Sequence, residues 1–374
     1  MEIRKAVRSL SEFIRKMTAD GVHDKESYHQ WKKDHLADME KFFWFNPQKG
    51  WPNINNLVNA FFHPTLPLVG LNYSPLAHNT LFAFPDAWTD PLRLCRGIIF
   101  DSDGNLVARP FVKFYNYGEH PETTDLPNES FEATTKHDGH LGIIFEYQKQ
   151  LLLTTRGDFA SASSVLGNKM LRQYARKHGW KKIYDGNICL LVEIIHPDTK
   201  VFLEYAGAEK FILIGATNRV TLEDYCYPIV TALAKKFHIE MTDLWHGQSI
   251  EELKTWIKDP TVKNREGFVV RFKSGLRVKF KFTTYIAMMV ADKLDYKYLM
   301  LRYMSGNLEK MLGILEEEVY LSAKQMLQEI LDITGNGKPQ KDRWRALYTL
   351  VAPEERTSYF RGICRQFIKF YDKK

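Results

Sequence analysis

One lysine in this sequence stands in a setting that could support covalent chemistry. It is Lys136, in the segment Lys136-His137-Asp138-Gly139. A lysine amine must lose its proton before it can attack an electrophile, and neighbouring positive charge favours the neutral form. A four-residue pattern can arise by chance, so its meaning depends on the groups that accompany it. We interpret His137 as a spacer that points away from the reacting centre.

Further charged residues follow Lys136 in order, each beside or within a predicted strand. They are Arg156, Glu193, Glu266, Lys279 and Lys281. The last two alternate along one strand, which places both on the same face. Glu193 lies inside the apolar run Leu190–Ile195, where an exposed role is unusual for a carboxylate. A structural, salt-bridged glutamate is the alternative interpretation.

This set of residue types suits a nucleoside triphosphate and a divalent metal. Cations would hold the phosphates and stabilise the charge that develops on phosphorus during transfer. Glu193 and Glu266 would bind ribose hydroxyls or position Mg²⁺, with Mn²⁺ as the alternative metal. Gly139 and Gly267 would let the backbone come close to the ligand. The chain has no GxxxxGK[ST], GxSxG or HExxH motif, so it would bind a triphosphate without a P-loop.

The elements that must position these groups change in character along the chain. Residues 1 to about 45 show helical spacing, and 50 to 92 suggest loops and short strands. Short β-branched and aromatic runs recur from 93 to 282, interrupted by a predicted helix at 162–178. We therefore predict an α+β fold with an antiparallel sheet. The predicted domains are a helical extension at 1–50, a catalytic domain at 51–284 and an all-helical domain at 285–374.

Composition narrows the possible settings. The 374 residues are 44% hydrophobic and carry a net charge of +7. Four widely spaced cysteines indicate neither a disulfide framework nor a zinc site. No apolar run is long enough to span a membrane, and nothing at the N-terminus resembles a signal peptide. We expect a cytoplasmic protein with no membrane partner.

Most of the positive charge is concentrated at the C-terminus. Residues 338–374 hold ten Lys or Arg against four Asp or Glu, together with seven aromatic residues. Interleaved cations and rings suit phosphates and stacked bases. A terminal amphipathic helix with a solvated basic face is an equal alternative.

From about residue 72 to about 285 the sequence resembles the covalent-lysine nucleotidyltransferases, and among them the RNA ligase 1 family of T-even bacteriophages. Lys136-His137-Asp138-Gly139 looks like the family's nucleotidyl-lysine motif. The other segments that carry the resemblance are Cys95–Phe100, Arg109–Asn116, Thr155–Gly157, Glu193 with His196-Pro197 and Leu203–Tyr205, Phe211–Gly215, Glu266–Val270 and Lys279–Lys281.

The resemblance implies roles for particular residues. Lys136 would be the nucleophile that accepts AMP, and Ile214 would pack on the adenine. The residues expected to bind ATP or AMP are Arg96, Lys113, Tyr115, Gly139, Arg156, Glu193, Ile214, Glu266, Gly267, Lys279 and Lys281, and Glu193 and Glu266 are also the expected metal residues. The sequence departs from the phage pattern at His140, which replaces Ser, and at Arg156, which replaces Lys.

The resemblance also implies an activity: ATP-dependent joining of an RNA 5′-phosphate to a 3′-hydroxyl. The implied RNA is a broken tRNA or another RNA under repair, and a separate end-healing kinase or phosphatase is a candidate partner of an expected monomer. DNA ligases and capping guanylyltransferases carry an OB-fold of five strands after the last motif. The helical spacing after residue 285 favours the RNA ligase branch. Those two enzymes and a catalytically silent RNA-binding relative remain the alternatives.

Overall fold

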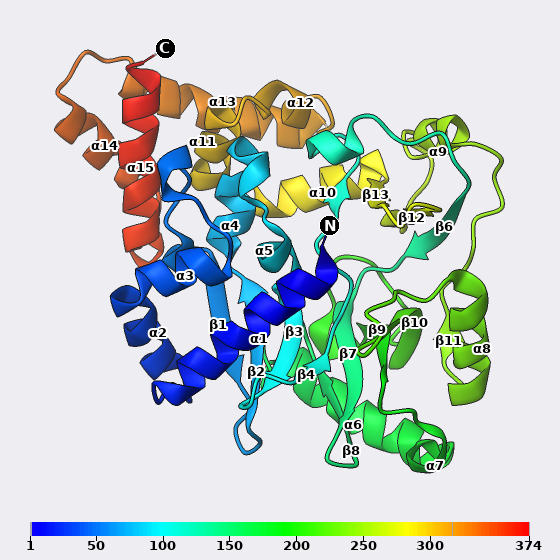
Figure 1. Cartoon of the computed structure of the whole chain (residues 1–374). Helices are drawn as coiled ribbons and strands as arrows, with labels where there is room; N and C mark the ends of the chain where they lie inside the picture. Colours follow the sequence, from blue (N-terminus) through cyan, green and yellow to red (C-terminus); the bar gives the residue numbers. More distant parts are fainter. Residues whose placement is uncertain (1, 316, 374) are drawn as a thin grey trace. The chain divides into compact units, whose positions relative to one another are not determined.

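The computed structural model describes residues 2–315 and 317–373, and the chain forms two compact units. The first unit comprises Met1–Gln248 and Gly267–Phe280, and the second comprises Ser249–Glu266 and Lys281–Lys374. Figure 1 shows the elements in sequence order. Mixed helices and largely antiparallel sheets confirm the predicted α+β class. The predicted domain boundaries near residues 50 and 284 stay predictions.

Three helices open the first unit: α1 (Ile3–Ala19), α2 (Lys25–Asp34) and α3 (Leu36–Phe42). The apolar positions of α1 lie on one face and are buried, while Asp24 caps α2 by accepting a hydrogen bond from the Ser27 backbone N–H. The buried face shares one hydrophobic cluster with residues of the first sheet. The N-terminal helices therefore complete a core rather than stand apart from it.

The first sheet has the strand order β1-β2-β3-β4, and neighbouring strands are antiparallel. Gly70 is required in β2 because an added Cβ would lie 2.0 Å from the Phe61 ring. The strands are β1 (Val58–Phe62), β2 (Leu68–Tyr73), β3 (Arg96–Asp101) and β4 (Leu106–Ala108).

The second sheet has the order β11-β10-β9-β7-β8, and helix α6 (Ala162–Lys177) packs on β8. Helix α8 (Tyr227–Phe237) packs beside β10 and β11. The strands are β7 (His140–Tyr147), β8 (Gln150–Thr154), β9 (Ile188–Ile195), β10 (Lys210–Asn218) and β11 (Glu240–Met241). Seven of the eight residues of β9 are buried, as its apolar run predicts.

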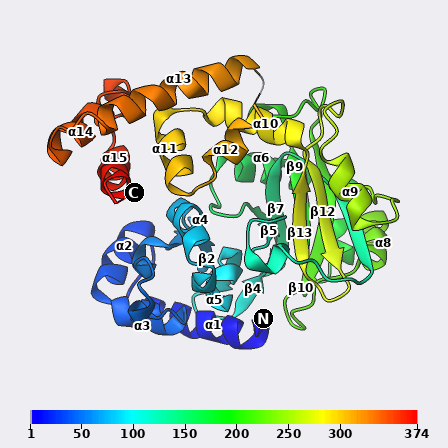
Figure 2. The same ribbon diagram turned by 90° about the horizontal axis from the view of Figure 1, so that it is seen from above.

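The third sheet has the order β5-β13-β12-β6 and leads directly to Lys136. Figure 2 shows its strands β12 and β13 near β9 and β7 of the second sheet. The strands are β5 (Tyr115–Asn116), β6 (Phe131–Lys136), β12 (Gly267–Phe272) and β13 (Arg277–Lys281). Strand β6 has only one fully buried residue, Ala133, which explains why its sequence shows no apolar run.

Short helices connect these elements. The α-helices are α4 (Pro75–Thr80), α5 (Asp90–Leu94), α7 (Trp180–Ile183) and α9 (Ile250–Trp256), and the 3₁₀ turns are η1 (Pro47–Lys49), η2 (Ile54–Asn56), η3 (Leu81–Ala83), η4 (Pro85–Ala87), η5 (Pro121–Thr123), η6 (Pro197–Thr199) and η7 (Pro353–Glu355).

Beyond β13 the second unit is helical, as the sequence predicts. Its core gathers aliphatic and aromatic side chains from α11, α13, α14 and α15. The helices are α10 (Thr283–Lys293), α11 (Tyr296–Met304), α12 (Leu308–Leu312), α13 (Glu317–Thr334), α14 (Gln340–Tyr348) and α15 (Ser358–Tyr371). Within the described residues, no helix combines the length and the apolarity that a membrane crossing requires.

Replacing Phe13 tests whether the N-terminal helices stabilise the first unit. Phe13 is fully buried and makes edge contacts with Trp31, Phe42 and Phe43. We expect Phe13→Ala to lower the free energy of unfolding by about 3–5 kcal/mol, measured by denaturant titration. Glu12→Ala on the same helix removes a polar side chain and should change it by less than about 0.5 kcal/mol. Equal stability of both variants would contradict this role.

Candidate functional site

Lys136 is the last residue of β6 and lies opposite Gly267, the first residue of β12. The ladder pairs six residues on each strand, so the backbone at Lys136 is fixed by its neighbour. The chain then turns through residues 137–139 and enters β7 at His140. Lys136 therefore stands where one sheet ends and the next begins.

The side chain of Asp138 holds the turn after Lys136. One of its carboxylate oxygens accepts hydrogen bonds from the backbone N–H groups of Phe202 and Leu203, each at 2.7 Å. The backbone N–H of Asp138 in turn donates to the Tyr205 hydroxyl at 2.8 Å. Asp138 is only 5% exposed. Its carboxylate thus connects the turn to the segment that follows β9, and charge-assisted hydrogen bonds of this kind are among the stronger ones.

Gly139 meets β9 so closely that no other residue fits. Its backbone N–H donates to Oε1 of Glu193 at 3.0 Å. An added Cβ would lie 2.5 Å from the carbonyl oxygen of Ile194. This contact explains the glycine of the motif by steric exclusion. Glu193 thus holds the backbone of the turn through this hydrogen bond, and its interpretation as a structural, salt-bridged residue stays an alternative.

A cavity of about 530 Å³ lies within the first unit, and Lys136 lines it. The wall takes residues from all three sheets and from the turn after β8. Of the predicted site residues, those in the wall are Arg96, Lys136, Gly139, Arg156, Glu193, Ile214 and Lys279. His137 also lines it, although we expected that residue to point away from the reacting centre. Burial lowers the pKa of His137 to about 4, so its ring is neutral at pH 7.

Positive charge is concentrated around this cavity. Burial, followed by the charges of Arg96, Lys113 and Lys136, lowers the pKa of the Lys279 ammonium well below its ordinary value. Burial also lowers the pKa of Lys113. Desolvation and like charge both disfavour the protonated forms. An anion that enters the cavity would relieve both, so the arrangement suits a ligand with several phosphates.

Lys113 itself does not line the cavity but sits in an aromatic cage. Its ammonium lies 5.2, 4.5 and 4.5 Å from the ring centroids of Tyr73, Trp88 and Tyr115. The Tyr115 ring is also stacked on His120 at 4.0 Å. Such contacts favour a cation that is kept from water. Tyr115 thus contributes to holding Lys113, and its expected contact with a nucleotide stays a prediction.

Arg156 is fixed by a tyrosine and by a hydroxyl-rich turn. Its guanidinium donates to the Tyr73 hydroxyl at 2.8 Å. Burial raises the pKa of Tyr73, but the charges of Arg156, Lys113 and Arg96 outweigh it, and the net shift is downward. The Ser164 hydroxyl accepts from the Thr155 backbone N–H at 3.0 Å. The turn that carries Arg156 is therefore anchored on both sides.

An apolar part of the cavity is formed by Phe111, Phe114, Ile214 and Gly215. Ile214 lies at a bulge, because the register of β10 with β9 shifts between Leu213 and Gly215. Gly215 is required there, since an added Cβ would lie 2.1 Å from the Phe111 ring. A flat ring and a bulged aliphatic side chain that line the same cavity suit the face of a planar base.

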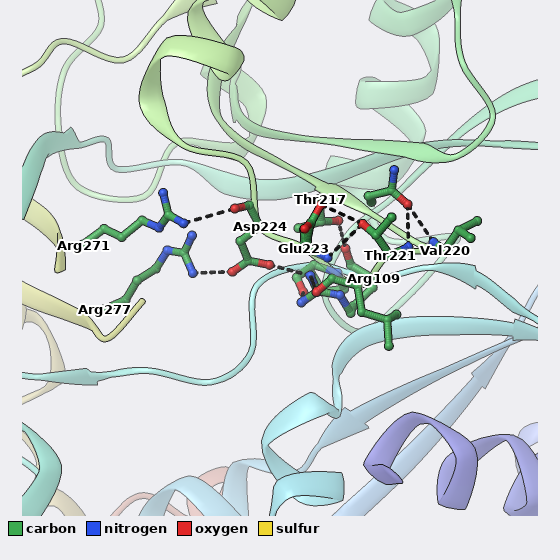
Figure 3. A network of polar contacts seen from close by, with 11 residues as sticks. Arg109, Thr217, Val220, Thr221, Glu223, Asp224, Arg271 and Arg277 are labelled. Carbon is green, nitrogen blue, oxygen red and sulfur yellow. Dashed lines mark hydrogen bonds and ion pairs between the residues drawn. The ribbon is translucent and has the colours of Figure 1, made fainter. Parts of the chain in front are cut away.

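The Phe111 ring is held by a buried network that sequence reasoning missed, drawn in Figure 3. The Arg277 guanidinium lies 3.8 Å from the centroid of that ring and pairs with Asp224. Asp224 also pairs with Arg109 at 2.5 Å, and its backbone carbonyl accepts from Arg271 at 3.1 Å. Burial alone would raise the pKa of Asp224, but the charges of Arg277 and Arg109 lower it. The one available signal was the aromatic content of the 109–116 segment; nothing local marked Asp224.

Two predicted site residues belong to the second unit. Glu266 is 3% exposed and forms an ion pair with Lys281, with Nζ and Oε1 2.8 Å apart. Glu266 directly precedes Gly267, whose ladder partner is Lys136. The roles of Glu266 and Lys281 at the site stay predictions.

The residues present fit a divalent metal that is held chiefly by a ligand. The described residues contain no group of three or more His, Cys, Asp or Glu side chains that could hold a metal ion. Mg²⁺ commonly takes one or two carboxylates and completes its shell with phosphates and water. Glu193, which lines the cavity beside a concentration of cations suited to phosphates, provides such a carboxylate.

Replacing Gly139 tests the close approach to β9. We expect Gly139→Ala to destabilise the first unit by about 1–3 kcal/mol, because the added methyl collides with backbone rather than with a flexible side chain. The measurement is the denaturant midpoint. Gly362→Ala on α15, where nothing lies within 4 Å of an added Cβ, should leave stability unchanged or raise it. A wild-type midpoint for Gly139→Ala would contradict the geometry.

Replacing Asp224 tests the network behind Phe111. Asp224→Asn leaves two buried arginines without their counter-charge, and we expect a loss of about 3–5 kcal/mol in unfolding free energy. Because the folded pKa of Asp224 is lowered, its contribution is present above the ordinary carboxyl pKa of about 3.9 and is lost as the pH falls further. The exposed neighbour variant Glu223→Gln should cost less than about 0.5 kcal/mol. Similar losses for both would refute the special role of Asp224.

Comparison with known proteins adds a family to this geometry. The model of the family described as RNA ligase matches residues 94–285, which is 192 of the 374 residues. A protein of Thermovibrio ammonificans described as a putative RNA ligase is 31% identical over 143 residues. The match covers 37% of this chain and 38% of that protein, so the chain spans well under half the length of the curated relative.

Solved structures of a Naegleria gruberi RNA ligase are also similar. A mutant with ATP and Mn has a TM-score of 0.36 and 16% identity, covering 42% of this chain and 50% of that one. The same enzyme with pyrophosphate has a TM-score of 0.36 and 17% identity, covering 42% and 51%.

Proposed function

The chain belongs to the RNA ligase family, and on this premise we propose that it is an ATP-dependent RNA ligase that acts through an adenylylated Lys136. The observation that carries the proposal is the cavity at the end of β6. It brings Lys136 together with a buried carboxylate, several cations and an apolar recess. This combination matches the parts of a nucleoside triphosphate.

In the first step the neutral amine of Lys136 attacks the α-phosphorus of ATP. The new N–P bond forms as the bond to pyrophosphate breaks, and the amine proton passes to solvent. Arg96, Arg156 and Lys279 stabilise the charge on the phosphate oxygens. Ile214 and Phe111 hold the adenine between them.

Glu193 has two tasks in this proposal. It receives the Gly139 N–H, which fixes the turn that presents Lys136. Its carboxylate would also bind the ribose or a divalent metal. Mg²⁺, or Mn²⁺ in its place, would neutralise phosphate charge when bound. Glu266 and Lys281 are proposed to complete the ribose, metal and phosphate contacts.

In the second step the 5′-phosphate of an RNA attacks the lysyl-AMP, so that AMP moves to the RNA and Lys136 is released. In the third step the 3′-hydroxyl of the other end attacks the activated phosphate, forming the phosphodiester and releasing AMP. We propose RNA ends, including those of a broken tRNA, as substrates, with a separate end-healing enzyme and a monomeric ligase. A cytoplasmic location is part of the same proposal.

Intact mass tests the central step directly. Incubation with ATP and Mg²⁺, without RNA, should add one adenylyl group to the wild type, and pyrophosphatase should increase the yield. Lys136→Ala should gain none, because it removes the nucleophile. Lys177→Ala, which changes an exposed lysine at the end of α6, should gain as much as the wild type. An adduct on Lys136→Ala, or none on the wild type, would overturn the proposal.

The acceptor requires a separate assay. Adenylylated protein is mixed with 5′-phosphorylated RNA or with nicked DNA, and sealed products are resolved by electrophoresis. We expect RNA joining with ATP. An adduct with GTP alone would indicate a capping guanylyltransferase, sealing of DNA alone would indicate a DNA ligase, and RNA binding without any adduct would indicate a silent relative.

A further inference from the structure

A second cavity lies wholly within the second unit, between α14 and α15. Its volume is about 790 Å³. Four of its lining residues belong to α14, at spacings of three, one and three residues, so they lie along one face of that helix. Two more belong to α15 and are four residues apart, so they also share a face. We call it the α14–α15 groove, and its lining residues are Lys341, Trp344, Arg345, Tyr348, Thr349, Arg361 and Arg365.

The lining of the α14–α15 groove includes four cations and no carboxylate. Within residues 2–315 and 317–373, none of these cations has an ion pair or a hydrogen bond. Arg343 on the same helix behaves differently, because it is 9% exposed and binds the Asp372 carboxylate through two hydrogen bonds of 2.8 Å. The Asp372 carboxylate binds Arg343 and Gln340, whereas the cations that line the groove are available to an anionic ligand.

Aromatic rings lie next to three of these cations. The Arg365 guanidinium is 4.4 Å from the Trp344 ring centroid, and that of Arg345 is 5.7 Å away. The Arg361 guanidinium is 5.2 Å from the Tyr348 ring, which also stacks on Phe360 at 5.8 Å. Contact with a ring limits the motion of a guanidinium, so less entropy is lost when its N–H groups bind an anion.

We propose that the α14–α15 groove binds single-stranded RNA, with arginine N–H groups on phosphates and bases stacked on the arginine and aromatic planes. The identity of the polymer as RNA rests on the proposed ligase function. Rings and guanidinium planes suit unpaired bases, which can leave their stack, whereas a duplex keeps its bases inside. Trp344 and Tyr348 are four residues apart, about 6 Å along the helix axis, which consecutive unstacked nucleotides can follow.

The test uses full-length protein without ATP and a fluorescent, 5′-phosphorylated single-stranded RNA, with anisotropy measured over a range of salt. The double variant Arg361→Ala with Arg365→Ala should bind about tenfold more weakly. Its plot of log affinity against log salt should be shallower by about 1.4, the value for two lost phosphate contacts. Arg361→Lys with Arg365→Lys keeps the charge but loses the planes, so its slope should stay at the wild-type value while affinity falls.

The matched control is Lys310→Ala with Lys324→Ala, which removes two exposed cations of the same unit outside the groove. It should bind RNA like the wild type.

All variants should form the Lys136 adduct normally, because that step needs no RNA. A missing adduct in every protein would refute the ligase proposal alone. The RNA site would be overturned if the arginine-to-alanine variant bound RNA with the affinity and the salt slope of the wild type. Stronger binding of duplex RNA than of single-stranded RNA would also overturn it. If an acidic peptide competed with the RNA for the groove, the groove would be assigned to a protein partner.

Discussion

Two carboxylates, those of Asp138 and Glu193, hold the turn at Asp138-Gly139, and the position of the cavity residues beside it depends on them. Asp138 receives two backbone N–H groups from the segment after β9, and Glu193 receives the Gly139 N–H from within β9. The turn is thus attached at one end to a strand and at the other to the loop that leaves the same strand. Lys136 directly precedes this turn, so both attachments of the turn help to fix its position. The hydrogen bonds of this turn hold the backbone beside Lys136 in place among the surrounding cations.

Mutual repulsion and burial of the cations around the cavity are energetically unfavourable, and an anionic ligand would offset both. Burial is the largest cause of the lowered pKa values of Lys279 and Lys113, and neighbouring cations lower both further. Negative charge at Glu119 acts on both lysines in the opposite direction. Aromatic rings supply part of the compensation, at Lys113 through its cage and at Lys279 through the Phe114 ring at 4.7 Å. Rings attract a cation without neutralising it, so the field of the cavity stays positive. The rings therefore add to the stabilisation that Glu119 gives the two lysines without adding negative charge that would repel phosphates.

Sequence reasoning succeeded where function and local pattern coincide. The strands with alternating or continuous apolar residues, such as β9 and β12, were predicted from their residues, and seven of the expected site residues line one cavity. It missed β6, because that strand carries Glu132, Thr134 and Thr135 toward the cavity rather than into a core. It also missed Asp224, which lies 115 residues from Arg109 and 53 from Arg277. A contact over such a separation leaves no periodic trace in the sequence.

In the basic C-terminal region, arginines that look alike in the sequence have different environments in the structure. Both interpretations of that region, a solvated helix face and a nucleic-acid surface, require exposed cations. Arg343 would serve neither, since it is buried against Asp372, while Arg361 and Arg365 are exposed on the face of α15 opposite Ile363 and Phe367. The arrangement of rings beside arginines that have no ion pair within the described residues supports the proposed nucleic-acid surface. A solvated face does not require cations to cluster around Trp344 and Tyr348. Such a cluster suits a ligand that has both charge and planar bases.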